Sequence, residues 1–398
     1  MPTEADARDR IVVVGASVAG LAACEELRAG GFDGAITLIG AESHAPYDRP
    51  PLSKQILLET MDVDDILLRE QAELDALELD IRLGQAATAL DVASQTVTLV
   101  DGSRVSGRAV VVATGSQPIR LPGQPLDPPF FELRTLDDAI RMRAALAGAE
   151  RLVIVGAGFI GLEVAAVARS RGCEVTVLEA AGHPLARVLA PEVVAPLAEL
   201  HRERGVEIRC DVQVVGFGHA DSGEALIILA DGSTLQADAA LIGIGAAPAV
   251  SWLAESGLDV AGGVQCDGGL RAAPGVWAIG DLARWEHPLF GDIRVEHWST
   301  TRDHARVMAQ NVLATLRGEA GSAVASAIPY FWSDQYDVKL QMAGWPIGAD
   351  EVESEVDEHR RVYRFRRGGK PVAALCWNWA RQIALERRAI ERQDSAQA

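Results

Sequence analysis

Two acidic residues, Glu42 and Glu179, each follow a glycine-rich turn at the distance at which a carboxylate binds the ribose of a dinucleotide. Glu42 lies 22 residues after Gly20, and Glu179 lies 18 residues after Gly161. A ribose offers two hydroxyl donors, and a carboxylate at the end of the second strand of a βαβ unit accepts them. The chain therefore has two candidate nucleotide sites, with a solvated loop carboxylate as the less favoured interpretation of Glu42.

The second turn is the stronger of the two signals. In "LVIVGAGFIGLE", Gly156, Gly158 and Gly161 come directly after a strand-like apolar run, and Phe159 and Ile160 begin a helical pattern. The first glycine permits the tight turn, the second lets a pyrophosphate approach the backbone, and the third lets the helix pack on the strand. This is a strong dinucleotide-binding fingerprint.

The acidic residue after that turn indicates which nucleotide binds. A carboxylate at Glu179 accepts hydrogen bonds from a free 2′-hydroxyl and repels a 2′-phosphate, and "EAAGH" puts no arginine directly beside it. The second site is therefore predicted to prefer NADH over NADPH.

The first turn, "IVVVGASVAG", is a weaker signal when taken alone. Gly15 and Gly20 occupy the first and last glycine positions, Ala19 precedes the last, and Ser17 replaces the middle glycine. The Ser17 side chain could crowd a phosphate or donate a hydrogen bond to it. The following "AITLIG" run, which leads to Glu42, supports a second βαβ unit.

Three further apolar runs end in small residues, which lets the chain cross close to a cofactor or between domains. Ordinary tight turns are the alternative for each. The runs are "VVVATGS", with Ala113, Thr114 and Gly115; "ALIGIGAAP", with Gly245; and "GVWAIGDLA", with Asp281.

Composition indicates an ordinary globular protein of two or three domains. The 398 residues are 48% apolar and 23% charged, and the net charge of −19 argues against general nucleic-acid binding. No apolar run approaches the ~18 residues of a membrane span, and "MPTEADARDR" does not resemble a signal peptide. We therefore expect no membrane association and a cytoplasmic location.

The cysteines give no sign of redox or metal chemistry. Cys24, Cys173, Cys210, Cys266 and Cys376 are scattered, with neither a C-x-x-C pair nor metal-ligand spacing. We expect them to be small buried hydrophobic residues, and we expect no metal site.

Charge is unevenly distributed near the C-terminus. Residues 350–358 contain six acidic residues and no basic ones, whereas residues 360–392 contain ten Arg or Lys and two Glu. Most of these side chains are expected to be solvated surface, but the second stretch could form a local cationic patch.

The order of motifs resembles the FAD-dependent pyridine-nucleotide oxidoreductases, and within them the NADH-dependent ferredoxin reductases of bacterial oxygenase systems. The motifs are GASVAG, YDRPPLSK, ATGS, GAGFIGLE, GIGAAP, AIGDLA and FWSDQY, spread from about residue 10 to about residue 390. The glycine motifs belong to the wider superfamily, while YDRPPLSK and FWSDQY are more diagnostic.

The resemblance implies an α/β fold with two Rossmann-like dinucleotide-binding domains, one for FAD and one for NAD, and a C-terminal α+β domain over the flavin. The expected limits are 1–115 and 243–320 for the FAD domain, 116–242 for the NAD domain and 321–398 for the cap.

The resemblance also implies the site residues. Lys54 is expected beside the flavin ring, with Glu163 holding it near flavin N5. The expected FAD contacts are Gly15, Ser17, Ala19, Gly20, Glu42, Arg49, Lys54, Ala113, Thr114, Gly115, Asp281, Trp298 and Trp332. The expected NADH contacts are Gly156, Gly158, Phe159, Ile160, Gly161, Glu179 and Gly245.

The implied partner is an acidic 2Fe-2S ferredoxin. Arg306 and the basic residues of 360–392 could form its docking surface, and Trp332 could lie between flavin and partner or be a plain core residue. Asp303 and His304 depart from the glutamine-like pattern expected there, which leaves the contacts of that helix open. The oligomeric state is expected to be a monomer or a homodimer.

Other classes stay open to different degrees. A disulfide reductase or peroxidase needs a redox cysteine beside the flavin, but Pro51, Leu52 and Ser53 stand where that thiol would be sought. Monodehydroascorbate-type or nitrite-system reduction is an enzyme alternative. A nucleotide-sensing flavoprotein similar to apoptosis-inducing factor is a further alternative, although the basic surface and targeting segment of such a protein are missing.

Overall fold

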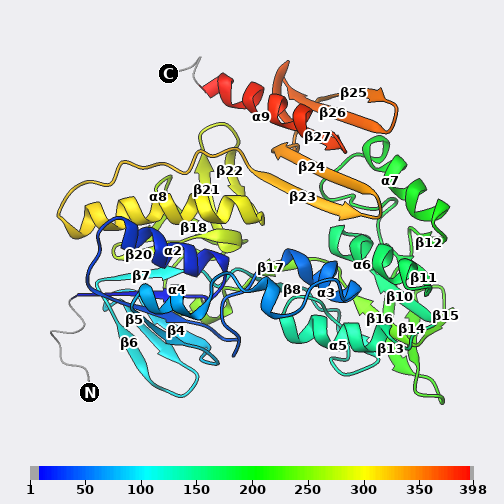
Figure 1. Cartoon of the computed structure of the whole chain (residues 1–398), viewed down its shortest axis with the longest axis horizontal. Helices are drawn as coiled ribbons and strands as arrows, with labels where there is room; N and C mark the ends of the chain where they lie inside the picture. Colours follow the sequence, from blue (N-terminus) through cyan, green and yellow to red (C-terminus); the bar gives the residue numbers. More distant parts are fainter. Residues whose placement is uncertain (1–8, 395–398) are drawn as a thin grey trace.

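The computed structural model describes residues 9–394 and arranges them as three blocks (Figure 1). Two blocks have parallel central sheets, and the third has an antiparallel sheet with one helix. Parallel sheets are buried on both faces, which explains why strands such as Arg10–Val14 and Arg151–Val155 are runs of Val and Ile with little alternation. The predicted α/β fold class is confirmed.

The first block is built on a six-stranded sheet whose middle strands are parallel. Helix α2 (Val18–Ala29) packs against the long helix α8 (Trp298–Leu316) on this block. The strand order is β19 (Arg271–Ala273), β20 (Val276–Ala278), β7 (Ala109–Val112), β1 (Arg10–Val14), β2 (Ala35–Ile39) and β3 (Leu79–Arg82).

The second block repeats this plan with a five-stranded parallel sheet and helices α5 (Leu136–Leu146), α6 (Phe159–Ser170) and α7 (Pro191–Glu203). Its strand order is β12 (Val206–Arg209), β11 (Glu174–Leu178), β10 (Arg151–Val155), β16 (Ala239–Ile242) and β9 (Phe130–Phe131).

A two-stranded antiparallel ribbon joins the two nucleotide blocks. It pairs β8 (Ser116–Pro118) with β17 (Ala246–Pro248), so the chain leaves the first block and returns to it side by side. Smaller sheets complete the blocks: β4 (Ala87–Asp91), β5 (Thr96–Leu99) and β6 (Arg104–Ser106); β13 (Val214–His219), β14 (Ala225–Leu229) and β15 (Thr234–Ala237); and β18 (Val264–Cys266), β21 (Ala283–His287) and β22 (Gly291–Arg294). The exact domain limits stay a prediction.

The cap block is an antiparallel sheet covered by α9 (Ala380–Asp394). Figure 1 shows it above the two nucleotide blocks, with β23 and β24 reaching down toward them. Its strand order is β23 (Tyr330–Gln335), β24 (Val338–Gly344), β27 (Lys370–Trp377), β26 (Arg360–Arg367) and β25 (Glu351–Asp357).

Short helices complete the connections, and two of them matter for the site. The turn η1 (Pro50–Ser53) begins with two prolines, whose fixed φ favours a tight first turn, and it leads through Lys54 into α3 (Gln55–Leu58). The others are η2 (Asp64–Ile66), α4 (Gln71–Ala76), η3 (Ser251–Leu253) and η4 (Gly280–Leu282).

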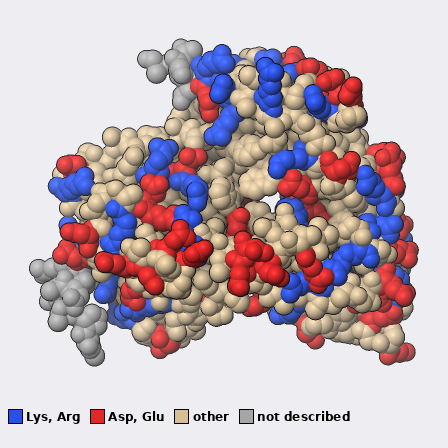
Figure 2. Space-filling model, in the orientation of Figure 1, with Lys and Arg blue, Asp and Glu red and all other residues tan. Residues whose placement is uncertain are grey.

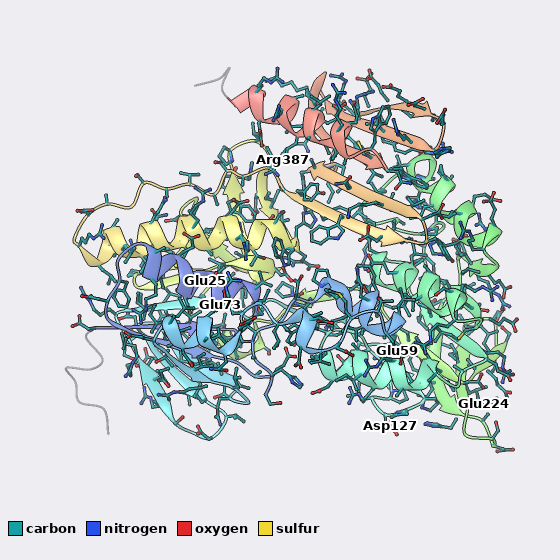
Figure 3. The ribbon with its side chains drawn as sticks, in the orientation of Figure 1. Glu25, Glu59, Glu73, Asp127, Glu224 and Arg387 are labelled. Atoms are coloured by element: carbon teal, nitrogen blue, oxygen red, sulfur yellow. The ribbon has the colours of Figure 1, made fainter. Side chains whose placement is uncertain are left out.

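Acidic side chains are spread over both nucleotide blocks. Figure 3 labels Glu25 and Glu73 on the first block and Asp127 and Glu224 on the second. Figure 2 shows acidic side chains gathered across the middle of the visible face and mixed with basic ones elsewhere.

Membrane-spanning helices and metal sites can be sought among the described residues. None of their helices has the length and apolarity to cross a bilayer, and among them no cluster of His, Cys, Asp and Glu could hold a metal ion. Four cysteines are buried as expected, while Cys210 is only half-buried.

Candidate active site

The first glycine turn has the close backbone packing that a dinucleotide fold requires. Gly15 has a φ of +122°, and a Cβ added there would lie 2.1 Å from the Ala113 carbonyl oxygen. A Cβ on Gly20 would lie 1.9 Å from the Gly15 carbonyl oxygen. Ser17 precedes α2 with extended backbone, and its side chain caps none of the helix N–H groups. The turn therefore keeps backbone donors free for an anion.

The second turn has the same geometry with one additional opening. Gly156 has a φ of +105°, and an added Cβ would lie 2.4 Å from the Gly243 carbonyl oxygen. A Cβ on Gly161 would lie 2.3 Å from the Gly156 carbonyl oxygen, whereas one on Gly158 would meet nothing within 4 Å. The backbone at Gly158 thus faces open space, which fits a pyrophosphate group.

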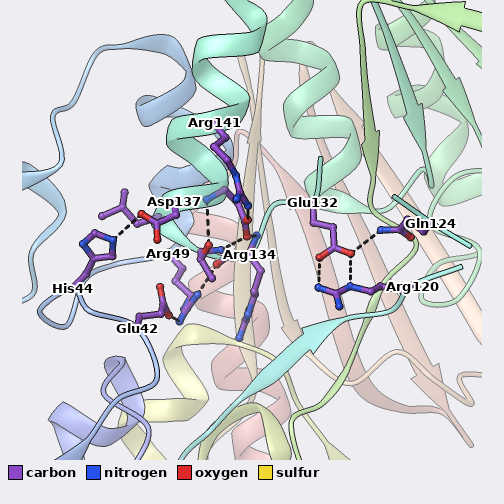
Figure 4. Close-up of polar contacts among 12 residues, drawn as sticks. Glu42, His44, Arg49, Arg120, Gln124, Glu132, Arg134, Asp137 and Arg141 are labelled. Carbon is purple, nitrogen blue, oxygen red and sulfur yellow. Dashed lines mark hydrogen bonds and ion pairs between the residues drawn. The ribbon is translucent and has the colours of Figure 1, made fainter. Parts of the chain in front are cut away.

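Glu42 is not a solvated loop carboxylate, because two side chains from the following loop bind it, and Figure 4 shows one of them, Arg49. Arg49 Nη2 lies 2.6 Å from Glu42 Oε1, and the Tyr47 hydroxyl donates to Glu42 Oε2 at 2.6 Å. Arg49 also donates to the Arg134 carbonyl oxygen at 2.5 Å. The carboxylate is fixed at the end of the second strand of the first block.

Arg134 was not anticipated from the sequence, and it puts a second guanidinium beside Arg49. It precedes Thr135, which caps α5, and its Nη2 lies 3.4 Å from Asp281 Oδ2. Burial, followed by the charge of Arg49, lowers the pKa of Arg134. The Glu42 and Asp281 carboxylates pair with these two guanidinium groups, whose several N–H donors also suit a phosphate as a further partner.

Asp281 is bound from several directions. Ser116 Oγ donates to its Oδ2 at 3.0 Å, and Arg294 donates to its carbonyl oxygen at 2.8 Å. Gly280 N–H donates to the buried His304. The Ala113–Gly115 loop is tied to the returning ribbon, because Thr114 donates to the Ala249 carbonyl oxygen at 2.8 Å.

Two backbone N–H groups hold the Glu179 carboxylate. It accepts the N–H of Ala157 at 2.8 Å and the N–H of Ala181 at 2.9 Å. Across the turn, Arg187 donates to the Ile244 carbonyl oxygen, and a Cβ on Gly245 would lie 2.4 Å from the Arg187 guanidinium. Arg187 therefore lies against the Ile244–Gly245 backbone.

Lys54 and Glu163 meet, as predicted. Lys54 Nζ lies 2.8 Å from Glu163 Oε2, and both residues are buried. Lys54 comes from the turn after η1, and Glu163 comes from the first turns of α6, so the ion pair joins the two nucleotide blocks. Figure 2 shows an opening between these blocks and the cap.

Two serines hold the same carboxylate. Ser53 Oγ donates to Glu163 Oε2 at 2.5 Å, and Ser333 Oγ, from cap strand β23, donates to Oε1 at 2.6 Å. Ser53 lies inside the motif YDRPPLSK and Ser333 inside FWSDQY, so these two motifs were the sequence signal that could have identified the serines.

Trp332 lies on the other face of β23 from Ser333, because successive strand residues point to opposite faces. Its ring centroid lies 6.2 Å from that of Trp298 and 6.4 Å from that of Tyr330. Trp298 Nε1 donates to Asp48 at 2.8 Å, and the Arg302 guanidinium lies 5.1 Å from the Trp298 ring centroid. The structure thus groups Trp298 and Trp332 in one aromatic cluster at the start of α8.

On α8, the open question about Asp303 and His304 has a structural answer. His304 is buried, its Nδ1 accepts the Gly280 N–H, and burial lowers its pKa to about 3. Asp303 Oδ1 instead lies 3.7 Å from the exposed Arg306 guanidinium. His304 supports the Asp281 loop, whereas Asp303 partly offsets the charge of Arg306.

Four of the ten basic residues of 360–392, namely Arg360, Arg364, Arg366 and Arg387, form ion pairs with acidic residues. Strand β25, which carries the acidic run, pairs along its whole length with β26. Arg364 therefore binds Glu355 and Glu386, and Arg366 binds Glu353. The two charge runs are antiparallel neighbours, so the cap offers less net positive field than its sequence suggested.

Comparisons with known proteins agree over nearly the whole chain. Residues 9–305 match the pyridine nucleotide-disulphide oxidoreductase family, and residues 330–398 match the reductase C-terminal family. The chain is 38% identical over 391 residues to the ferredoxin–NAD(+) reductase component of the anthranilate 1,2-dioxygenase system of Burkholderia cepacia, covering 96% of this chain and 94% of that protein.

Two further similarities concern putidaredoxin reductase. The Pseudomonas putida protein is 36% identical over 357 residues, which cover 87% of this chain and 83% of that protein. The solved structure of a covalent putidaredoxin reductase–putidaredoxin complex superposes with a TM-score of 0.90 at 33% identity, covering 96% of this chain and 93% of that chain.

Proposed function

Because the chain belongs to the pyridine nucleotide-disulphide oxidoreductase family, we propose that it is an FAD-dependent NADH:ferredoxin reductase that supplies electrons to an oxygenase. The observation that carries the proposal is the buried Lys54–Glu163 pair at the junction of the two nucleotide blocks. The Tyr47–Lys54 segment that supplies the lysine has no cysteine, so disulfide exchange has no thiol there. Electrons must then leave the cofactor directly.

FAD, when bound, supplies the chemistry of accepting a hydride from NADH and giving up electrons one at a time. The first block would hold it, with the Gly15–Gly20 turn and the Arg49 and Arg134 guanidiniums on the pyrophosphate and Glu42 on the adenosine ribose. The second block would hold NADH, with the Gly156–Gly161 turn on the pyrophosphate and Glu179 on the ribose.

Lys54 supplies positive charge beside the reacting end of the cofactor, and Glu163 fixes where that charge lies. A buried ammonium stabilises negative charge arriving on a neighbouring ring, and it does so without reorganisation because it is already in place. No general acid or base of the protein is required for a direct hydride transfer.

The aromatic cluster of Trp298 and Trp332 marks where electrons leave, and α8 supplies the adjoining positive charge. Three of the five β26 arginines pair with acidic residues, whereas Arg302 and Arg306 are exposed on α8, the helix that carries Trp298. We therefore place the ferredoxin contact at Arg302 and Arg306 rather than on β26. The partner is a 2Fe-2S ferredoxin with an acidic face, and attraction between the two faces raises the association rate.

Anaerobic titration with NADH tests the proposal. Purified protein should be yellow, contain about one FAD per chain, bleach with NADH and reduce a member of a panel of 2Fe-2S ferredoxins. Protein that binds no FAD would refute the proposal. Reduction of monodehydroascorbate but of no ferredoxin would favour that alternative, and slow NADH oxidation coupled to a change in oligomeric state would favour a nucleotide sensor.

Salt dependence and one substitution test the docking face. Ferredoxin reduction should slow as salt rises, since screening acts over about 8 Å at physiological ionic strength, while reduction of a small neutral acceptor should not. Arg306→Glu should lower ferredoxin turnover about tenfold and leave flavin reduction by NADH unchanged. Indifference of ferredoxin reduction to both salt and substitution would mean that the partner docks elsewhere.

A further inference from the structure

The Glu163 carboxylate is the end of a buried hydrogen-bonded chain that runs through the cap and back into the second block. Its links are Ser333 to Glu163 at 2.6 Å, Gln335 Nε2 to Ser333 Oγ at 3.1 Å, Gln335 Oε1 to His201 Nε2 at 2.8 Å, and His201 Nδ1 to the Tyr336 hydroxyl at 3.3 Å. Ser333 is 1% exposed, and Gln335 and His201 are fully buried.

The direction of each bond follows from the carboxylate. An ionised carboxylate only accepts, so the Ser333 hydroxyl must donate to Glu163 and accept from the Gln335 amide N–H. The Gln335 oxygen then faces His201, whose Nε2 must carry the proton. Burial lowers the pKa of His201, so the ring is neutral near pH 7 and its Nδ1 accepts the Tyr336 hydroxyl.

The two oxygens of Glu163 have different partners. Oε2 accepts from Ser53 and Lys54, whereas Oε1 accepts from Ser333. Without Ser333 the carboxylate can rotate, because its terminal torsion is broad. The bond from the cap therefore decides which lone pair meets Lys54, and hence where the ammonium lies.

The side chains of the hydrogen-bonded chain lie on one face of β23, because successive strand residues point to opposite faces. Phe331, Ser333 and Gln335 point toward the second block, where Phe331 packs on Phe159 at 4.8 Å between ring centroids. Trp332 and Asp334 point to the other face, and Asp334 lies 3.5 Å from Lys339.

We propose that Ser53 and Ser333 are positioning residues of the hydride-transfer site, with Gln335 and His201 locking Ser333, so that the cap completes the site as well as covering it. This inference rests on the proposed function, because it assigns Lys54 to the reacting end of FAD. It adds that the alignment of Lys54 depends on a hydrogen bond from a different block.

Stopped-flow reduction of the FAD-loaded protein by NADH tests the inference. Ser333→Ala should lower the limiting rate of flavin reduction about ten- to a hundredfold, as expected for a small misplacement of a catalytic group, and should leave the dissociation constant for NADH within about twofold. Ser333→Thr keeps the hydroxyl and suits a strand, so it should restore most of the rate. Asp334→Asn, on the opposite face of β23, is the matched control and should react like wild type.

An equilibrium measurement supplies a second readout. If Lys54 drifts from its position, reduced flavin loses stabilising positive charge, so the midpoint potential of bound FAD should become more negative in Ser333→Ala and more so in Lys54→Met. Should Ser333→Ala fail to retain FAD, Ser53→Ala and Ser53→Thr allow the same pair of measurements on the other serine.

The outcomes separate the two proposals. An unchanged rate and potential in Ser333→Ala, or a loss of rate that Ser333→Thr does not restore, would overturn the positioning role while leaving ferredoxin reduction by wild type intact. An unchanged rate in Lys54→Met would instead remove the catalytic pair. Failure of wild type to reduce any ferredoxin would count against the proposed function alone.

Discussion

The two glycine turns are almost the same in backbone and differ in the side chains around them. Gly15 and Gly156 both have positive φ, and each donates its N–H to the end of the second strand of its unit, at 2.7 Å. The carboxylates that follow are held differently. Glu42 is bound by the side chains of Tyr47 and Arg49, whereas Glu179 accepts hydrogen bonds from the backbone N–H groups of Ala157 and Ala181.

This difference supports the proposal that the first turn holds a retained nucleotide and the second an exchanged one. Arg49, Arg134 and Asp281 come from three separate segments of the chain and are linked to one another in the first block. The second turn is more open, since Gly158 faces free space and Ile160 is 46% exposed.

The largest effect should come from adding a side chain at the first glycine of the first turn. Gly15→Ala puts a Cβ into the Ala113 carbonyl oxygen at a backbone conformation that L residues avoid, which should cost more than about 3 kcal/mol and abolish FAD retention. Gly158→Ala meets no protein atom and should fold normally, raising only the KM for NADH. FAD content and chemical denaturation measure both. Normal FAD content in Gly15→Ala would contradict the geometry of the first turn.

Acid should destabilise the first block through its buried histidines. Burial lowers the pKa of His297 to about 4 and that of His304 to about 3, against about 6.5 for each in the unfolded chain. Below pH 6.5 the unfolded state therefore binds protons that the folded state does not, and the free energy of unfolding falls as pH decreases.

One variant isolates the contribution of a single histidine. His304→Asn keeps an acceptor for the Gly280 N–H but removes the titrating group. Between pH 6.5 and pH 5, its free energy of unfolding should therefore decrease by about 2 kcal/mol less than that of wild type. Urea denaturation at several pH values gives the comparison. Identical pH slopes in the two proteins would mean that His304 is not the proton acceptor on unfolding.

A substitution at Glu179, which follows the second turn, should change the preference for NADH over NADPH. Glu179→Arg removes the acceptor for a 2′-hydroxyl and offers a partner to a 2′-phosphate, so the ratio of kcat/KM for NADH to that for NADPH should fall about tenfold or more. Glu207→Arg, a half-exposed position on the adjacent strand β12, is the control and should change the ratio little. Equal use of both coenzymes by wild type would make the assignment of Glu179 wrong.

The smallest effect should distinguish the arginine that lines the first pocket from one outside it. Arg134→Gln removes a guanidinium that lies 3.4 Å from Asp281, and it should weaken FAD binding about fivefold. Arg141→Gln removes a half-exposed guanidinium whose ion pair is with Asp138, and it should leave FAD binding unchanged. Flavin release followed by fluorescence measures both, and equal release rates would remove Arg134 from the site.

Local sequence determined the parts of this protein that depend on backbone geometry. The turns at Gly15 and Gly156, the strands that precede them and the positions of Glu42 and Glu179 are set by residues within about thirty positions of one another. Such short-range patterns predict a βαβ unit because the glycines are needed for steric reasons that do not involve the rest of the chain. The contact between Lys54 and Glu163 was predicted from the resemblance to a known family and not from such local patterns.

The tertiary structure decided which side chains from distant segments share one space. Ser333 reaches Glu163 across 170 residues, His201 reaches Gln335 across 134, and Arg134 joins Arg49 across 85. The cap charges are a second case, since pairing of β25 with β26 converts two runs of opposite charge into ion pairs. Sequence composition counts charges, but only strand register and block packing determine which charge faces which, because Coulomb energies and hydrogen bonds depend on distances of a few ångströms.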